Sequence, residues 1–369
     1  MKLTVVSPLH IGSGNELTVI DIVPVTEKTL AVLDKEKLFE ELIKRGADVE
    51  ELLSELRNCQ QLGDEYIWRM YLGKYNVPIE EVLKYTLPVV GGIGSRSVRI
   101  REFIKTNGKP YIPGSSVKGA IRTAIFYYVA LNNQRELDGF LKYLTGRDTR
   151  VSREQADDEL EKLIFGHSKG RYEPKNDPMR ALIVRDTEPF GLRHLKMFSV
   201  TTVGGEKGIP QYVEGIEEIT LDVDIHVDGD ILREGLNNKA FNGLLANEIS
   251  NKESFENLIW TAIDKFSKEI VSYETSSKEI MKYGGFKDSV RRFYSKLSGI
   301  EGHKLRVGWG SGWYSMTIGS LFIGTFFFDQ IRKKFKLGMN PRTKKLSKDF
   351  PKTRRVANGK PMGWVVLNE

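Results

Sequence analysis

The sequence is poor in cysteine and has no long hydrophobic run. Cys59 is the single cysteine of the 369 residues, which excludes a disulfide within the chain and is typical of a reducing compartment. The most apolar stretch, residues 318–328, is interrupted by glycine and serine and falls short of the ~20 residues that span a bilayer. Residues 1–12 are too briefly apolar for a signal peptide. We therefore expect a soluble, cytoplasmic protein without membrane contact.

The sequence also lacks the usual patterns of catalytic residues. The five histidines show no metal-ligand spacing, and neither an HExxH nor a GxSxG motif is present. Asp222, Asp224, His226 and Asp228 alternate along an expected strand and could hold a divalent ion, as nuclease carboxylates do. The same alternation is what a half-exposed antiparallel strand shows. We therefore favour a solvated strand face and expect no metal and no cofactor.

Positive charge is concentrated at one end of the chain. The formal net charge is +7 for the whole sequence. Residues 331–369 contain twelve Lys or Arg and two acidic residues, a net charge of +10, which leaves −3 for residues 1–330. A segment this basic attracts polyanions such as nucleic acids, although a solvated tail that aids solubility has the same composition.

Strand and helix patterns alternate along the whole chain, which indicates an α+β protein. We expect strands at 3–8, 17–25, 181–189, 192–203 and 216–229, a hairpin at 106–109, and helices at 34–58 (broken at Gly46), 116–132, 253–283 and 286–298. Residues 150–180 are charged and interrupted by proline, so we expect an exposed connection there. The pattern divides into two halves of similar size, 1–190 and 191–369, which we interpret as two domains.

The glycine-rich segment RVGWGSGW, residues 306–313, has glycine at every second position from 308 to 312. Such glycines mark backbone that bends sharply or approaches another group closely. The segment is either a tight turn between strands or a loop whose N–H groups wrap an anion. Trp309 and Trp313 either stack on a ligand or pack in the core, and we expect at least one to pack. A similar segment, HIGSG at 10–14, follows the first strand.

The best-defined helix start lies in YIPGSSVKGAIRTA, residues 111–124. Ser115 or Ser116 can cap this helix. Lys118 and Arg122 lie one turn apart on a face that we expect to be exposed, near a helix N-terminus that disfavours cations unless an anion binds. We therefore predict a phosphate site here, with a merely solvated face as the alternative.

Six short segments occur in a fixed order through the whole chain. They are SPLHIGSG at 7–14, IPGSSVKGAIRTA at 112–124, FG at 165–166, VRDTEP at 184–189, RVGWGSGW at 306–313 and FPKTRRV at 350–356. The first five resemble the RAMP proteins of CRISPR effector complexes. The last narrows the resemblance to the Csm-type (type III-A) subunit that caps the complex.

The resemblance implies tandem ferredoxin-like, RRM-like RAMP domains with Gly-rich loops and helical insertions. It implies a non-catalytic subunit that holds the 3′ portion of the crRNA and could also contact target RNA. Its protein partners would be the adjacent backbone RAMP subunit, the other Csm subunits and recruited trimming nucleases. The RNA-binding residues implied by matching position are His10, Gly12, Ser13, Gly14, Ser115, Ser116, Lys118, Arg122, Gly308, Gly310, Ser311, Gly312, Lys352, Arg354 and Arg355.

Two other functions remain open on the sequence. A metal-independent endoribonuclease that processes repeat RNA would use His10 as general acid or base on a ribose 2′-OH. The equivalent RAMP subunit of a Cmr-type complex would carry similar loops.

Overall fold

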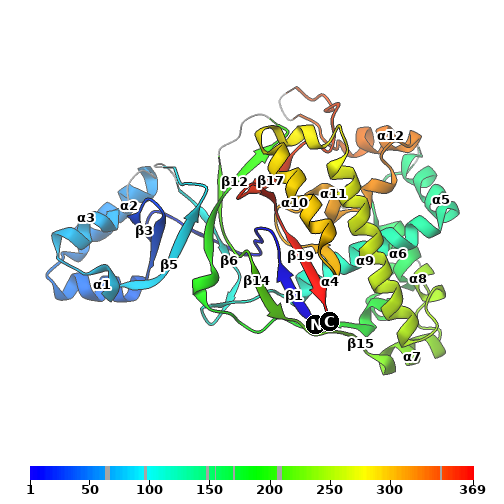
Figure 1. The fold of residues 1–369 in the computed structure, drawn as a ribbon, viewed down its shortest axis with the longest axis horizontal. Helices are drawn as coiled ribbons and strands as arrows, with labels where there is room; N and C mark the ends of the chain where they lie inside the picture. The colour runs from blue at the N-terminus through cyan, green and yellow to red at the C-terminus, as the bar shows by residue number, and fades with distance from the viewer. Residues whose placement is uncertain are drawn as a thin grey trace.

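The computed structural model describes residues 1–62, 67–94, 98–146, 149–153, 155–168, 171–205, 210–340 and 343–369. Two β-sheets form the middle of the molecule, most helices lie on one side of them, and three helices form a small lobe on the other side (Figure 1). The predicted α+β class is therefore confirmed. In the described part of the chain, no helix combines the length and the apolar character that a membrane span requires.

The first sheet joins the two ends of the chain. It is antiparallel in the order β14-β1-β19-β16, with β1 at Lys2–Val5, β14 at Ile219–Asp222, β16 at His303–Arg306 and β19 at Trp364–Asn368. Because β1 pairs with β19, the N- and C-termini lie next to each other (Figure 1). Helices α4 (Gly114–Asn132) and α9 (Lys252–Thr275) pack against each other and against β16. Two helices beside a four-stranded antiparallel sheet agree with the expected ferredoxin-like fold.

The second sheet has nine strands: seven follow the order β2-β6-β13-β12-β5-β4-β3, β17 pairs with β12, and β18 pairs with β17. Their bounds are β2 Gly12–Leu17, β3 Ile22–Thr26, β4 Thr29–Leu33, β5 Leu83–Val90, β6 Ile100–Phe103, β12 Lys196–Val203, β13 Gln211–Gly215, β17 Arg354–Ala357 and β18 Lys360–Pro361. Each sheet thus takes strands from before and after residue 190. The expected boundary at that residue does not separate one sheet from the other.

The small lobe has a hydrophobic core of its own. It contains α1 (Lys35–Lys44), α2 (Val49–Leu62) and α3 (Ile67–Lys74), and its core includes the fully buried Leu38, Leu52 and Trp68. The predicted break at Gly46 is confirmed, since its φ of +87° ends α1 and Ala47 N–H donates to the Leu42 carbonyl. The indole N–H of Trp68 donates to the Ile20 carbonyl at 2.6 Å, which ties the lobe to the chain entering β3.

The remaining elements surround these two sheets. The helices are α5 Gln134–Thr145, α6 Asp158–Phe165, α7 Gly229–Asn237, α8 Leu244–Asn247, α10 Lys287–Gly299, α11 Trp313–Met316 and α12 Phe326–Phe335, with 3₁₀ turns at 79–81, 174–176, 178–181, 192–194, 280–286 and 319–321. The short strands are β7 Lys105–Thr106, β8 Lys109–Pro110, β9 His167–Ser168, β10 Arg171–Tyr172, β11 Leu182–Val184 and β15 Ile225–Val227. The predicted hairpin at 106–109 is confirmed as β7–β8.

The strand expected at 216–229 is interrupted. β14 ends at Asp222 and β15 begins at Ile225, and the two belong to different sheets. Asp228 lies beyond β15, where its carboxylate caps the N-terminus of α7 by accepting from two backbone N–H groups. The four polar residues of the expected strand face therefore do not share one strand.

The two glycine-rich segments are brought together. The backbone N–H of Trp309 donates to the His10 carbonyl at 2.9 Å. Gly308 has a φ of +78°, and a Cβ atom there would lie 2.5 Å from the His10 carbonyl oxygen. Glycine is required at this point because two segments of the chain touch through their backbones.

We expect Gly308→Ala to destabilise the protein more than Gly312→Ala. Both residues have a positive φ, but a Cβ at Gly312 meets nothing within 4 Å. The conformational strain alone costs about 1–2 kcal/mol. Gly312→Ala should therefore lower the free energy of unfolding by that amount, and Gly308→Ala should lower it by clearly more. Urea unfolding of the two variants measures the difference, and equal losses would contradict the backbone contact.

Candidate nucleic-acid interface

Trp309 lies on one face of the nine-stranded sheet between two arginines. Arg101 of β6 is in register with Val213 of β13, and Arg355 of β17 is in register with Thr202 of β12. Since side chains alternate along a strand, these residues share a face with Val213 and its partner Phe198. The ring of Trp309 packs on the apolar part of this face. We call Arg101, Trp309 and Arg355 the platform.

The platform has two cations over one aromatic ring. The guanidinium carbons of Arg101 and Arg355 lie 4.7 and 4.3 Å from the Trp309 ring centre. Burial and the charge of Arg101 both lower the pKa of Arg355, which means that the two positive charges repel. Among the described residues, no carboxylate forms an ion pair with either arginine. Stacking surface and unneutralised charge together are what single-stranded nucleic acid binds.

The HIGSG segment forms an edge strand beside the platform, not the expected loop. Gly12, Ser13 and Gly14 are exposed and belong to β2, which pairs with β6 around a bulge. Gly14 has a φ of +93°, and nothing lies within 4 Å of a Cβ built there. Glu16, two residues on, is opposite Arg101. This stretch therefore offers bare main chain next to the platform, consistent with its predicted role.

The buried His10 side chain packs against Trp309 of the platform. Its side chain is 1% exposed, its Nδ1–H donates to the Glu214 carbonyl at 2.6 Å, and its ring meets the Trp309 ring edge-on. Burial lowers the pKa of His10 to about 4, against the raising effect of the Glu214 hydrogen bond, and the charges of Arg101 and Lys105 lower it further. The ring is neutral and covered. The side chain that was expected to contact RNA, with a role on a ribose hydroxyl as the alternative, is therefore buried in this structure.

The start of α4 differs from the prediction. The helix begins at Gly114, and neither Ser115 nor Ser116 caps it. Instead the carboxylate of Asp186 accepts from the Gly114 N–H at 2.8 Å, and Thr187 exchanges hydrogen bonds with Ile112. The motifs at 112–124 and 184–189 therefore bind each other, and an acidic side chain already occupies the position predicted for a phosphate.

Lys118 and Arg122 are not exposed as expected. Lys118 Nζ donates to the Leu182 carbonyl at 2.7 Å, and burial lowers its pKa. Arg122 pairs with Asp177 at 2.6 Å and with Glu161, and its guanidinium carbon lies 3.5 Å from the Phe165 ring centre. Both acidic partners come from the segment at 150–180, which folds onto α4 and is not an exposed connection. These two cations serve the fold.

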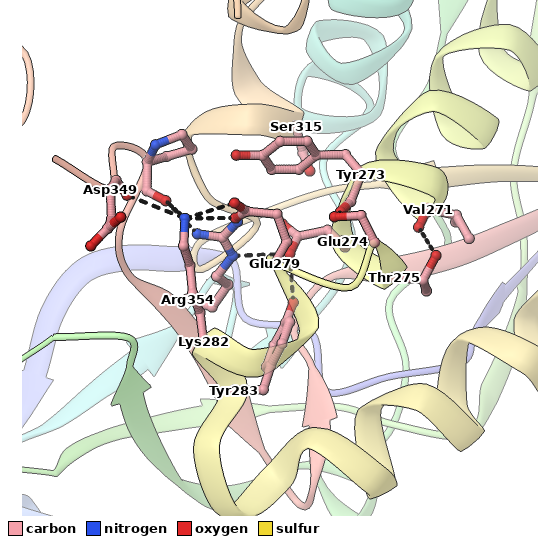
Figure 2. Close-up of polar contacts among 12 residues, drawn as sticks. Val271, Tyr273, Glu274, Thr275, Glu279, Lys282, Tyr283, Ser315, Asp349 and Arg354 are labelled. Atoms are coloured by element: carbon pink, nitrogen blue, oxygen red, sulfur yellow. Dashed lines mark hydrogen bonds and ion pairs between the residues drawn. The ribbon is translucent and has the colours of Figure 1, made fainter. Parts of the chain in front are cut away.

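The side chains of the basic motif at 350–356 have different environments. Arg354 is buried, with Nε 2.9 Å from Glu274 and Nη2 2.5 Å from Glu279 (Figure 2). Lys282 also pairs with Glu279 and donates to the Pro351 carbonyl, so the segment before β17 is fixed to residues 274–283 (Figure 2). Arg354, which was expected to contact RNA, is therefore held in buried ion pairs within the chain. Arg355, the next residue, turns to the platform, and Lys352 is exposed.

The remaining residues of the Gly-rich loop make packing contacts within the protein and also border a pocket. Ser311 is buried and donates to the Gly308 carbonyl, and a Cβ at Gly310 would touch Met362. Trp313 packs against Gly319 and Phe350, and both Trp313 and Trp309 are half-buried residues packed against hydrophobic clusters. On the side away from the platform, the loop and α4 flank one pocket of about 270 Å³.

The acidic residues of the alternative metal site, which the sequence analysis did not favour, are spread over separate ion pairs. Asp222 pairs with Lys2 at 2.7 Å, and Asp224 contacts His226 and Arg185. Within the described ranges, no group of three His, Cys, Asp or Glu side chains is arranged to hold a metal ion.

Sequence reasoning missed Arg101, which lies in no motif. The sequence signal for Arg101 was the alternation of apolar Val98 and Ile100 with Arg99 and Arg101, which predicts a strand but not what covers it. Only the placement of Trp309 makes Arg101 part of a site.

Replacing Arg354 should lower the free energy of unfolding, whereas replacing Lys352 should leave it nearly unchanged. Arg354→Ala leaves the buried Glu274 without a counterion, while Lys282 still pairs with Glu279, and the loss of a buried ion-pair partner costs about 3–5 kcal/mol. Lys352→Ala changes an exposed side chain and should stay within about 0.5 kcal/mol. Thermal or urea unfolding measures both, and a stable Arg354→Ala variant would contradict the buried ion pair.

His10 should stay neutral well below the usual range for histidine. The unfolded chain takes up this proton near pH 6.5, but the folded protein does so only near 4, so acidification through this window should remove about 3 kcal/mol of stability through His10. An NMR titration of the imidazole signals measures the folded pKa. His10→Gln should lose this part of the pH dependence. Titration of the His10 ring near pH 6.5 would refute its burial.

The comparisons with known proteins agree with this geometry. The model of the RAMP superfamily matches residues 2–315. The CRISPR system Cms protein Csm5 of Methanocaldococcus jannaschii is 21% identical over 410 aligned positions, covering 100% of this chain and 88% of that protein. The Csm5 protein of Streptococcus thermophilus is 27% identical over 236 residues, which is 60% of this chain and 61% of that protein.

Two solved structures match over nearly the whole length. A chain in the cryo-EM structure of a Csm–crRNA–target RNA ternary complex of a type III-A CRISPR–Cas system is 40% identical, with a TM-score of 0.86 and coverage of 100% of this chain and 99% of that chain. The crystal structure of T. onnurineus Csm5 is also 40% identical, with a TM-score of 0.79 and coverage of 99% and 100%. The chain therefore belongs to the RAMP superfamily and, within it, to the Csm5 proteins of type III-A CRISPR systems.

Proposed function

We propose that this protein is an RNA-binding structural subunit of a type III-A Csm ribonucleoprotein. It caps the complex at the 3′ portion of the crRNA, contacts the neighbouring RAMP subunit and performs no catalysis itself. The observation that carries the proposal is the 40% identity, over the full length, to a chain of a Csm–crRNA–target RNA complex.

The platform supports this function independently of the relatives. A single-stranded RNA presents bases for stacking and phosphates for ion pairing. Trp309 supplies the ring, and Arg101 and Arg355 supply charges that no carboxylate within the described residues neutralises. The open main chain at 12–14 continues this surface along the sheet edge. Lys352, also exposed, extends the positive charge at the other end.

Co-expression with the other Csm subunits, followed by sequencing of the bound RNA, tests the assembly. We expect a discrete spacer-containing RNA in the purified complex. Co-purification with Cmr-type backbone subunits instead would favour the Cmr assignment. A discrete cut in repeat RNA, made by the purified protein in EDTA, would favour the endoribonuclease.

We expect Arg101→Ala combined with Arg355→Ala to weaken RNA binding by tenfold or more at about 0.15 M salt. Loss of two phosphate contacts should also reduce the slope of the logarithm of the RNA-binding constant against the logarithm of the salt concentration by about two. Arg291→Ala with Arg292→Ala is the matched control, because it removes two exposed arginines of α10. Equal affinities of the two double variants would contradict a role for the platform.

A further inference from the structure

Arg306 is a buried cation without a carboxylate partner among the residues that the structure describes. Its side chain belongs to a residue that is 5% exposed, the same depth as Arg354. Nε donates to the Met362 carbonyl at 2.9 Å and Nη1 to the Ser315 hydroxyl at 3.2 Å, and both acceptors are neutral. Within the described part of the chain, Nη2 donates to no acceptor and no acidic side chain forms an ion pair with Arg306. Buried charges in proteins are usually paired, because an unpaired one is costly.

This arginine lines the pocket between α4 and the Gly-rich loop. The pocket has a volume of about 270 Å³ and is lined, among others, by Ser116, Gly119, Thr123, Gly308, Ser311 and Ser315. Hydroxyl-bearing residues and glycines line the pocket together with Arg306, whose guanidinium carbon lies 5.6 Å from the Trp364 ring centre, and no carboxylate is among the described residues that line the pocket. A pocket with a guanidinium, several hydroxyls and no negative charge is suited to a small anion.

The pocket and the platform lie on two sides of one loop. Trp309 faces Arg101 and Arg355, whereas Gly308 and Ser311 face the pocket. An RNA strand bound at the platform is therefore separated from the pocket only by the Gly-rich loop. This adjacency favours a phosphate of the RNA backbone over an acidic side chain of a protein partner.

We propose that this pocket binds one phosphodiester group of the RNA, with Arg306 as its counterion. The inference rests on the proposed RNA-binding function and adds a buried phosphate site to the exposed platform. It also accounts for the contrast with Arg354, whose two carboxylates come from the chain itself, whereas the counterion of Arg306 comes from the ligand.

Gly119 allows a test that leaves the arginine in place. It lies on the exposed side of α4, lines the pocket, and has nothing within 4 Å of a Cβ built there. Gly119→Glu would supply an internal carboxylate near Arg306, and Gly119→Gln is the matched control of nearly equal size. Without RNA, we expect Gly119→Glu to melt several degrees above Gly119→Gln. With a single-stranded oligouridylate of 20 nucleotides, we expect its affinity to be at least tenfold lower.

A second set of experiments uses the variant Arg306→Met. It should lower the affinity for the same oligonucleotide by about tenfold, and Gly119→Glu and Gly119→Gln should melt alike in its background. Inorganic phosphate, compared with chloride at equal ionic strength, should raise the melting temperature of the unmodified protein but not that of Arg306→Met. If Arg306→Met fails to fold, the Gly119 pair still decides the question.

The outcomes separate the two proposals. Equal RNA affinity of Gly119→Glu and Gly119→Gln would overturn the phosphate site while leaving the proposed function intact. Loss of a co-purifying Csm subunit from Gly119→Glu, at unchanged RNA affinity, would assign the pocket to a protein carboxylate and also overturn it. Absence of any RNA binding by the unmodified protein would contradict the proposed function itself.

Discussion

Three chain segments far apart in sequence interlock through their backbones, and the rest of the molecule depends on this contact. Gly363 N–H donates to the Pro8 carbonyl, Val307 N–H to the Gly363 carbonyl and Trp309 N–H to the His10 carbonyl. A Cβ at Gly363 would lie 2.4 Å from the Val307 carbonyl oxygen. The contact joins the connection between β1 and β2, the Gly-rich loop and the start of β19, so it links both sheets and fixes Trp309 above the nine-stranded one.

Positive charge in this protein has two separate uses. Lys118, Arg122 and Arg354 hold elements together through buried partners. Arg101 and Arg355 keep their charge available because the aromatic ring between them cannot neutralise it. The net charge of a segment therefore overstates what it offers to a polyanion, and the useful charge is the part without acidic neighbours.

The sequence predicted the elements better than the site. The break at Gly46, the hairpin at 106–109 and the long helix after Pro113 follow from local turn chemistry and periodicity, and all three form. The partners of Arg122 could not be predicted, because Glu161 and Asp177 lie 39 and 55 residues away. Arg101 and Arg306 carry no motif, and they become informative only when a tryptophan or a pocket is placed beside them.

The pairing of the two chain ends has a consequence for synthesis on the ribosome. β1 is made long before its neighbours β14 and β19, which begin at Ile219 and Trp364. The small lobe, by contrast, draws its core from residues 23–83 alone. It can fold while the chain is still being made, whereas one edge of β1 stays unpaired until β14 is made and the other until β19 is made. Closure of the four-stranded sheet, and with it the position of the Gly-rich loop, therefore comes later than folding of the small lobe.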